Sequence, residues 1–277
     1  MKVLVIGGVA AGTKAAAKLK REDRGLDVAL ITKDQDISYA GCGLPYYVGG
    51  MIESRDELIV NTPEKYAALT GVRVLTGREA VELDSGKKLV TAKNLITGET
   101  EAYSYDRLVI ATGASSAVPP IEGVGLKGVF KMRTPDDAIR IRDYVEAERV
   151  KKAVVIGGGF IGLEVAENLL AQGVDVTVMD FASQIMPNVL DPEMADYAQR
   201  HLRKQGVRVL TGTKAEKLVG GEEAMDQILH DLFNRELDPM YPYLTYQDFL
   251  NACGLTEEDL TFRELPNPYL GTRNRKL

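Results

Sequence analysis

The sequence predicts an α/β fold in which one supersecondary unit occurs twice. Residues 2–6 form a short run that is β-branched and apolar. A glycine-rich turn follows, and after it an Ala- and Lys-rich stretch at 13–21. The same order of strand, glycine turn and helix returns from residue 152, with the turn at 157–162 and the helix continuing to about residue 172. This order is typical of nucleotide-binding α/β units. We therefore expect two Rossmann-like dinucleotide-binding domains.

Each unit continues into a second strand. Residues 27–32 supply it in the first copy and residues 175–180 in the second. In both copies the strand, helix and strand together take up roughly 30 residues, the usual length of a βαβ unit. A helix at 194–205 and a short strand at 207–210 extend the second copy, which has too few strand segments to complete its sheet.

The chain between the two units predicts a β insert. Segments near residues 72–76, 88–92 and 101–105 alternate in polarity and are expected to form an antiparallel sheet. Residues 108–113 then predict a buried strand that runs into a glycine turn, and two consecutive prolines at 119–120 mark a linker.

The last part of the chain differs in character. Between residues 222 and 237 the apolar side chains fall at helical spacing, and two later segments resemble helix capping boxes. We expect a mostly helical C-terminal extension. The predicted organisation is a first domain at 1–118, a linker and helix at 119–150, an incomplete second domain at 151–221 and the divergent tail at 222–277.

Composition excludes several classes of protein. The hydrophobic fraction is 45% and the charged fraction 27%, which are ordinary for a globular chain. A net charge of -6 argues against nucleic-acid and anionic-membrane partners. No apolar run is long enough to span a bilayer, so a cytoplasmic location is expected. The chain has two cysteines, Cys42 and Cys253, and no CxxC pair, which excludes a disulfide framework.

The second glycine motif predicts a dinucleotide site. It follows a strand, opens a helix and precedes Asp180, an acid at the end of the next strand. Glycine lets the backbone approach a pyrophosphate, and the carboxylate of Asp180 would accept hydrogen bonds from ribose hydroxyls and repel a 2′-phosphate. NADH is therefore favoured over NADPH; the competing interpretation is a glycine-rich packing turn. The expected contacts are Gly157, Gly159, Phe160, Ile161, Gly162 and Asp180.

The first glycine motif is less regular. A valine replaces its middle glycine, and Thr32 stands where a ribose-binding acid is expected. Asp34 or backbone groups are alternatives for that contact. The expected cofactor-binding residues are Gly7, Gly8, Val9, Ala10, Ala11 and Gly12.

Cys42 lies in a loop of small residues, SYAGCGLPYY, that leads into a segment Pro45 can start as a helix. The positive end of a helix dipole favours a thiolate, and the flanking glycines leave the sulfur open to a ligand. The alternative is a buried structural cysteine.

Four segments together carry a family resemblance: the first glycine motif, SYAGCGLPYY, LVIATGA at 108–114 and QIMPNVLDPEMA at 184–195. From residue 1 to about residue 221 the chain resembles the flavin-dependent pyridine nucleotide-disulfide oxidoreductases. Within them it is similar to the single-cysteine group of coenzyme A-disulfide reductases, NADH oxidases and persulfide reductases, truncated after the start of the NAD domain. The resemblance implies FAD at the first glycine motif and NADH at the second.

The same resemblance implies the chemistry and its residues. Electrons would pass from NADH through FAD to a disulfide or persulfide at Cys42, with Ser38 as a polar neighbour of the sulfur. Further contacts to FAD are implied for Lys33, Ala111, Thr112 and Gly113. Lys14, Lys18 and Arg21 share one helix face and are candidates to bind the phosphates of coenzyme A; a solvated lysine face is the alternative.

The chain also departs from the family pattern. Peroxidase and water-forming oxidase relatives carry a histidine in the first glycine region, whereas this chain has only His201 and His230. No group of residues has metal-ligand spacing. Neither the AxGD segment that contacts FAD nor the family's dimer-forming domain is found, although the resemblance implies a homodimer. The alternatives to a sulfur reductase are an NADH oxidase working through a cysteine sulfenic acid and an inactive, truncated nucleotide-binding member.

Overall fold

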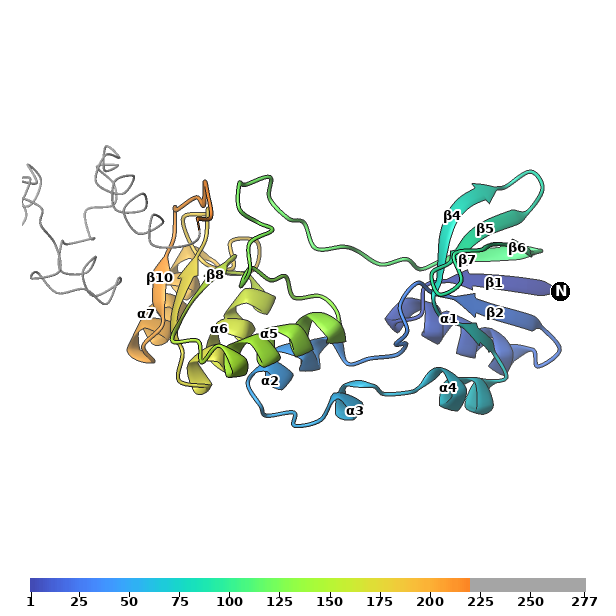
Figure 1. Cartoon of the computed structure of the whole chain (residues 1–277), viewed down its shortest axis with the longest axis horizontal. Helices are drawn as coiled ribbons and strands as arrows, with labels where there is room; N and C mark the ends of the chain where they lie inside the picture. Colours follow the sequence, from blue (N-terminus) through green and yellow to red (C-terminus); the bar gives the residue numbers. More distant parts are fainter. Residues whose placement is uncertain (220–277) are drawn as a thin grey trace, which may run out of the picture. The chain divides into compact units, whose positions relative to one another are not determined.

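A computed structural model describes residues 1–219, and residues 1–218 form one compact unit. Two parallel sheets and one antiparallel sheet lie within it (Figure 1). The first parallel sheet has the order β3-β2-β1-β7. Its strands are β1 (Lys2–Ile6), β2 (Asp27–Ile31), β3 (Arg73–Leu75) and β7 (Arg107–Ile110).

Both faces of this first sheet are covered, as expected for parallel strands. Val3 and Val5 of β1 point toward helices α1 (Ala10–Glu22) and α4 (Pro63–Thr70) and share a core with Leu30. The alternate residues of β1 belong to a second cluster with the antiparallel sheet. That sheet consists of β4 (Arg78–Asp84), β5 (Leu89–Asn94) and β6 (Thr100–Ser104).

The structure corrects the predicted insert at its first strand. Residues 72–76 were expected in the antiparallel sheet, but β3 pairs in parallel with β2, with Leu30 opposite Val74. Helix α4, which ends at Gly71 with φ +73°, supplies the connection that parallel strands require. In the antiparallel sheet β5 pairs with β6 on one side and with β4 on the other, and the sequence analysis did not identify β4.

The second parallel sheet has the order β10-β9-β8. Its strands are β8 (Lys152–Ile156), β9 (Asp175–Met179) and β10 (Arg208–Leu210), and its helices are α6 (Phe160–Ala171) and α7 (Pro192–Lys204). Val176 and Val178 are fully buried in the core that includes residues of α6. On the other face Val154 and Ile156 remain 59% and 48% exposed.

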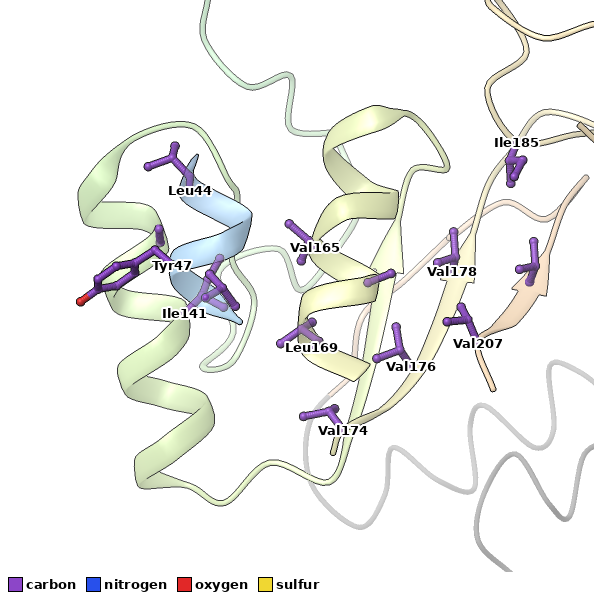
Figure 2. Packing of buried hydrophobic residues seen from close by; sticks show 14 of the residues in the cluster. Leu44, Tyr47, Ile141, Val165, Leu169, Val174, Val176, Val178, Ile185 and Val207 are labelled. Atoms are coloured by element: carbon purple, nitrogen blue, oxygen red, sulfur yellow. The ribbon is translucent and has the colours of Figure 1, made fainter. Parts of the chain in front are cut away.

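Three further helices surround the cysteine loop. Cys42 lies in a single 3₁₀ turn, η1 (Gly41–Gly43), which leads directly into α2 (Leu44–Val48); α3 (Arg55–Leu58) follows, and α5 (Pro135–Ala147) precedes β8. Figure 2 shows Leu44 and Tyr47 of α2 beside Ile141 of α5, with Val165 and Leu169 of α6 in the same buried cluster. The short helix α2, which follows Cys42 and is called the cysteine helix below, is therefore held by apolar packing on the two longer helices α5 and α6.

The repeated order of strand, turn and helix is confirmed in both copies, and β1 and β8 have the expected bounds. The expected helical extension at 222–277, with its two capping boxes, lies outside the described residues. No helix within residues 1–219 is long and apolar enough to cross a membrane.

Gly49→Ala is expected to destabilise the chain. A Cβ at Gly49 would overlap Oδ1 of the buried Asn168 and lie 2.8 Å from its Cγ, so α2 and α6 would have to separate. Overpacking of this kind costs about 1–3 kcal/mol of unfolding free energy, measurable by urea denaturation followed by circular dichroism. Gly125→Ala is the control, because nothing lies within 4 Å of its added Cβ. Equal unfolding free energies for the two variants would contradict the close approach.

Candidate functional site: two glycine turns and a cysteine loop

The first glycine turn places the start of α1 directly behind β1. Gly7 has φ +112°, and its N–H donates to Ile31 O at 2.8 Å. A Cβ at Gly12 would overlap the carbonyl oxygen of Gly7, so only glycine allows this approach of helix to strand. A Cβ at Gly7 would likewise overlap the carbonyl oxygen of Ala111, which follows β7. The predicted residues of the first turn and of the segment after β7 are thus adjacent.

The N-terminus of α1 has no side-chain cap. Its N-cap, Val9, provides no side-chain hydrogen bond, its first turn contains no acidic residue, and Ala10 and Ala11 are exposed. By contrast, α4 and α5 are capped by Thr62 and Thr134. Free amides at a helix N-terminus, combined with the helix dipole, favour a bound anion such as a pyrophosphate.

The second glycine turn repeats this geometry. Gly157 has φ +116°, its N–H donates to Met179 O at 2.8 Å, and a Cβ at Gly162 would overlap the carbonyl oxygen of Gly157. Helix α6 also begins without a side-chain cap or an acidic first turn, and Phe160 and Ile161 are exposed there. Both motifs therefore present the same type of helix N-terminus at the end of a strand.

The duplication extends beyond the glycines. Ser38 N donates to Gly8 O at 2.9 Å, and Met186 N donates to Gly158 O at 2.9 Å. These two residues share a left-handed backbone conformation, with φ +50° and +51°. Ser38 in the cysteine segment and Met186 in the segment 184–195 thus occupy equivalent places. The sequence analysis did not identify this equivalence, because the residues differ and only the backbone hydrogen bond is shared.

The residue after the second strand differs between the two turns. Asp180 accepts hydrogen bonds from Gly158 N–H at 2.5 Å and from Ala182 N–H at 2.7 Å, so its carboxylate lies against the second glycine turn. Thr32 occupies the corresponding place in the first turn, where it is 5% exposed and its methyl group faces Gly8. The residue directly after the second strand is therefore a carboxylate beside the second turn and a buried threonine beside the first.

Polar groups near the first turn gather around Arg133, a residue that the sequence analysis missed. Its Nε donates to Ala114 O at 3.1 Å, and its Nη2 lies 3.5 Å from the position of a Cβ on Gly113. The pKa of the neighbouring Asp34 carboxyl is raised above its usual value, mainly by burial. The positive charges of Lys33 and Arg133 oppose this rise. No spacing in the sequence links residue 133 to residue 113, so only the fold reveals this group.

Cys42 is exposed and its loop is anchored on both sides. On one side Ser38 is bonded to the first glycine turn, and Ala40 N donates to Leu58 O at 2.8 Å. On the other side Gly43 N donates to Ala40 O at 2.9 Å and α2 begins. This exposure contradicts the alternative interpretation of Cys42 as a buried structural cysteine. The expectation that the cysteine stands at the start of a helix needs correction, since the 3₁₀ turn intervenes and α2 has only five residues.

Several other residues singled out in the sequence are exposed. Lys14, Lys18 and Arg21 are all exposed on α1, and Lys18 pairs with Glu22. Lys33, Thr112 and Gly113 are also exposed. His201 is exposed on α7, and His230 and Cys253 lie outside the described residues. Within residues 1–219 no group of three His, Cys, Asp or Glu side chains is arranged to hold a metal ion.

Comparisons with known proteins agree with this geometry. A family model described as pyridine nucleotide-disulphide oxidoreductase matches residues 1–238. An NADH oxidase from Methanocaldococcus jannaschii is 39% identical over 80% of this chain and 50% of its own length. An NAD(P)H coenzyme A polysulfide/persulfide reductase from Pyrococcus horikoshii is 37% identical over 83% of this chain and 50% of its own length.

Solved structures show the same fold. The chain is similar to reduced CoADR-RHD from Bacillus anthracis, with a TM-score of 0.77 and 37% identity over 78% of this chain and 39% of that one. It is also similar to an NAD-dependent persulfide reductase from A. fulgidus, with a TM-score of 0.77 and 41% identity over 80% of this chain and 41% of that one. The chain spans about half the length of the curated relatives it matches. On the family match and the shared fold, the chain belongs to the pyridine nucleotide-disulphide oxidoreductase family.

Proposed function

We propose that this chain uses NADH and FAD to reduce a disulfide or persulfide, with coenzyme A disulfide as the candidate substrate type, and that Cys42 is its reactive thiol. The hydrogen bond from Ser38 N–H to Gly8 O carries this proposal, because it ties the cysteine segment to the first glycine turn. Four residues of extended chain span at most about 14 Å, so Cys42 stays within reach of a cofactor bound at that turn. The exposure of Cys42 leaves it open to a substrate.

The residues present fit the cofactors that this family uses, FAD and NAD(P)H. Each glycine turn brings uncapped helix amides to the end of a strand, where a pyrophosphate can accept hydrogen bonds. In the family's pattern the first turn binds FAD and the second binds NADH. Asp180 beside the second turn supports NADH over NADPH, because a carboxylate there repels a 2′-phosphate.

The thiol chemistry follows from the exposed cysteine. The thiolate of Cys42 attacks one sulfur of the substrate, which forms a mixed disulfide and releases the first thiolate. FAD, when bound, supplies the two electrons that originate from NADH and cleave this mixed disulfide. Cys42 returns to its thiolate, the second substrate thiol leaves, and one NADH and one proton are consumed for each disulfide. When the substrate is a persulfide, the two products are the parent thiol and hydrogen sulfide.

An NADH oxidase is the second candidate function, and it is supported by the similarity to the M. jannaschii enzyme. In that case Cys42 would cycle through a sulfenic acid. The single histidine of the described residues, His201, lies exposed on α7 rather than in the first glycine turn. This placement favours the sulfur substrate.

The purified chain should bind FAD and be yellow, and NADH should bleach it under anaerobic conditions. The physical reason is that both glycine turns and both open helix starts are formed within residues 1–219. Absorbance near the flavin band, recorded before and after stoichiometric NADH, measures this. A colourless protein that cannot be reconstituted with FAD would support the inactive alternative.

Cys42→Ser should abolish turnover of coenzyme A disulfide while leaving the bleaching by NADH intact, since serine cannot form the mixed disulfide. Turnover is measured by NADH consumption and free thiol release. Cys253→Ser is the matched control, because it removes the other cysteine of the chain and should retain activity. Disulfide turnover that survives Cys42→Ser would rule out the proposed thiol.

Asp180→Ala should weaken the preference for NADH over NADPH by roughly tenfold or more, the size of effect expected when a hydrogen bond to a charged group is lost. The ratio of kcat/KM values for flavin reduction by the two nucleotides measures the preference. Asp175→Ala, at the exposed start of the same strand, is the control and should leave that ratio unchanged. An unaltered ratio in Asp180→Ala would show that this carboxylate does not face the ribose.

A further inference from the structure

The loop that follows α2 turns back on itself: the N–H of Gly50 donates to Tyr47 O at 3.1 Å, and the carbonyls of Gly49, Ile52 and Glu53 accept from side chains of other elements. Gly49 N–H donates to Pro45 O at 3.0 Å, and the N–H groups of Met51 and Ile52 both donate to Tyr46 O. The last carbonyls of a helix lack partners within the helix and need donors from elsewhere. Here the donors are side chains of α5 and of the residue that ends α6.

Nη1 of Arg142, on α5, has three carbonyl oxygens within reach of its two N–H groups. Its Nη1 lies within hydrogen-bond distance of Ile52 O and Glu53 O, at 3.2 Å each, and of Tyr47 O at 3.4 Å. Its guanidinium carbon lies 4.8 Å from the centre of the Tyr47 ring, and its Nε donates to Glu146 at 3.0 Å. A lysine ammonium could donate to these carbonyls but would lack the hydrogen bond from Nε to Glu146 and the planar group over the Tyr47 ring, so it would reproduce only part of the arrangement.

The end of α6 holds the same loop from a second direction. Gln172, which caps α6, donates through Nε2 to the carbonyl oxygen of Gly49. Asn168, one turn earlier, packs so closely on Gly49 that no Cβ fits there, and its Nδ2 donates to Glu164 O at 2.8 Å. The opposite end of α6 begins at the second glycine turn. One helix thus connects the proposed NADH site with the helix that follows Cys42.

These contacts leave Cys42 between two fixed points. On its N-terminal side Ser38 is bonded to the first glycine turn, and on its C-terminal side α2 is attached to α5 and α6. The turn Gly41–Gly43 bridges them, and at Gly41 nothing lies within 4 Å of an added Cβ. The place of the thiol is therefore determined by its two anchors rather than by contacts at Gly41.

We propose that Arg142 and Gln172 are positioning residues for Cys42, acting through the carbonyl groups at the end of α2. The proposal rests on the proposed function in that Cys42 is the reacting thiol. Neither residue touches the sulfur. Their role is to keep the cysteine turn in the place where its mixed disulfide can be reduced, and misplacement by about 1 Å lowers such a step by up to roughly 100-fold.

Arg142→Met tests the proposal, because methionine keeps an apolar side chain over Tyr47 and removes the donors. In FAD-loaded protein carrying Cys253→Ser, kcat for disulfide turnover should fall by roughly 10- to 100-fold, while bleaching by NADH changes less than about twofold. The rate of alkylation of Cys42 by iodoacetamide should shift by at least about threefold, because release of the carbonyl groups changes the surroundings of the already exposed sulfur. Arg142→Lys should restore part of the turnover.

Arg140→Met is the matched control: it lies on the same helix, its side chain is exposed and its partner is Asp137. It should leave turnover and alkylation unchanged. Wild-type turnover and alkylation in Arg142→Met would overturn the proposal. If Arg142→Met does not fold, Gln172→Leu serves as the second variant, and an unchanged alkylation rate there would overturn the proposal equally.

The two proposals fail in different ways. Disulfide turnover that persists in Cys42→Ser contradicts the proposed function. An alkylation rate that shifts in Arg142→Met but not in Arg140→Met supports the positioning role whether or not the wild-type chain turns over disulfides, because alkylation requires neither FAD nor a disulfide substrate.

Discussion

The close approach of a helix to a strand at two glycines is the constraint on which the rest of the structure depends. At Gly12 and Gly162 the helix backbone rests on the carbonyl of the first glycine of its own turn, and no side chain fits between them. This contact directs the uncapped amides of α1 and α6 past the ends of β1 and β8. The same turns also fix the loops that follow the second strands, through the carbonyls of Gly8 and Gly158. The two proposed dinucleotide sites and the start of the segment that carries Cys42 therefore rest on one backbone geometry.

The two copies have diverged in the residues that this geometry presents. The first copy places Ser38 where the second places Met186, and the chain after Ser38 leads to the exposed Cys42. The second copy places Asp180 where the first has the buried Thr32. A carboxylate beside the second turn suits a ribose, whereas a thiol after the first turn suits electron transfer. Under the proposed function, the asymmetry of residues within a common backbone would separate nucleotide selection from sulfur chemistry.

Strands and turns, which depend on residues that are neighbours in the chain, could be predicted from the sequence. Contacts between residues far apart in the chain could not. The apolar runs and glycines predicted β1, β8 and both turns, because strand, turn and helix follow one another directly in the chain. The pairing of β3 was predicted wrongly because three residues carry too little pattern to distinguish parallel from antiparallel partners. Arg133 and Arg142 were not identified, since their partners are backbone carbonyls that are far away in sequence.

The uneven burial of the second sheet bears on stability more than on chemistry. Parallel strands are normally covered on both faces, yet Val154 and Ile156 of β8 are largely exposed beside a fully buried Val176 and Val178. The helix that carries the second glycine turn packs on the buried face and, through Gln172, on the loop after the cysteine helix. Covering the exposed face would therefore stabilise β8 without contacting α6. The contacts that hold the loop after α2 come instead from α6, which packs on the buried face of the sheet.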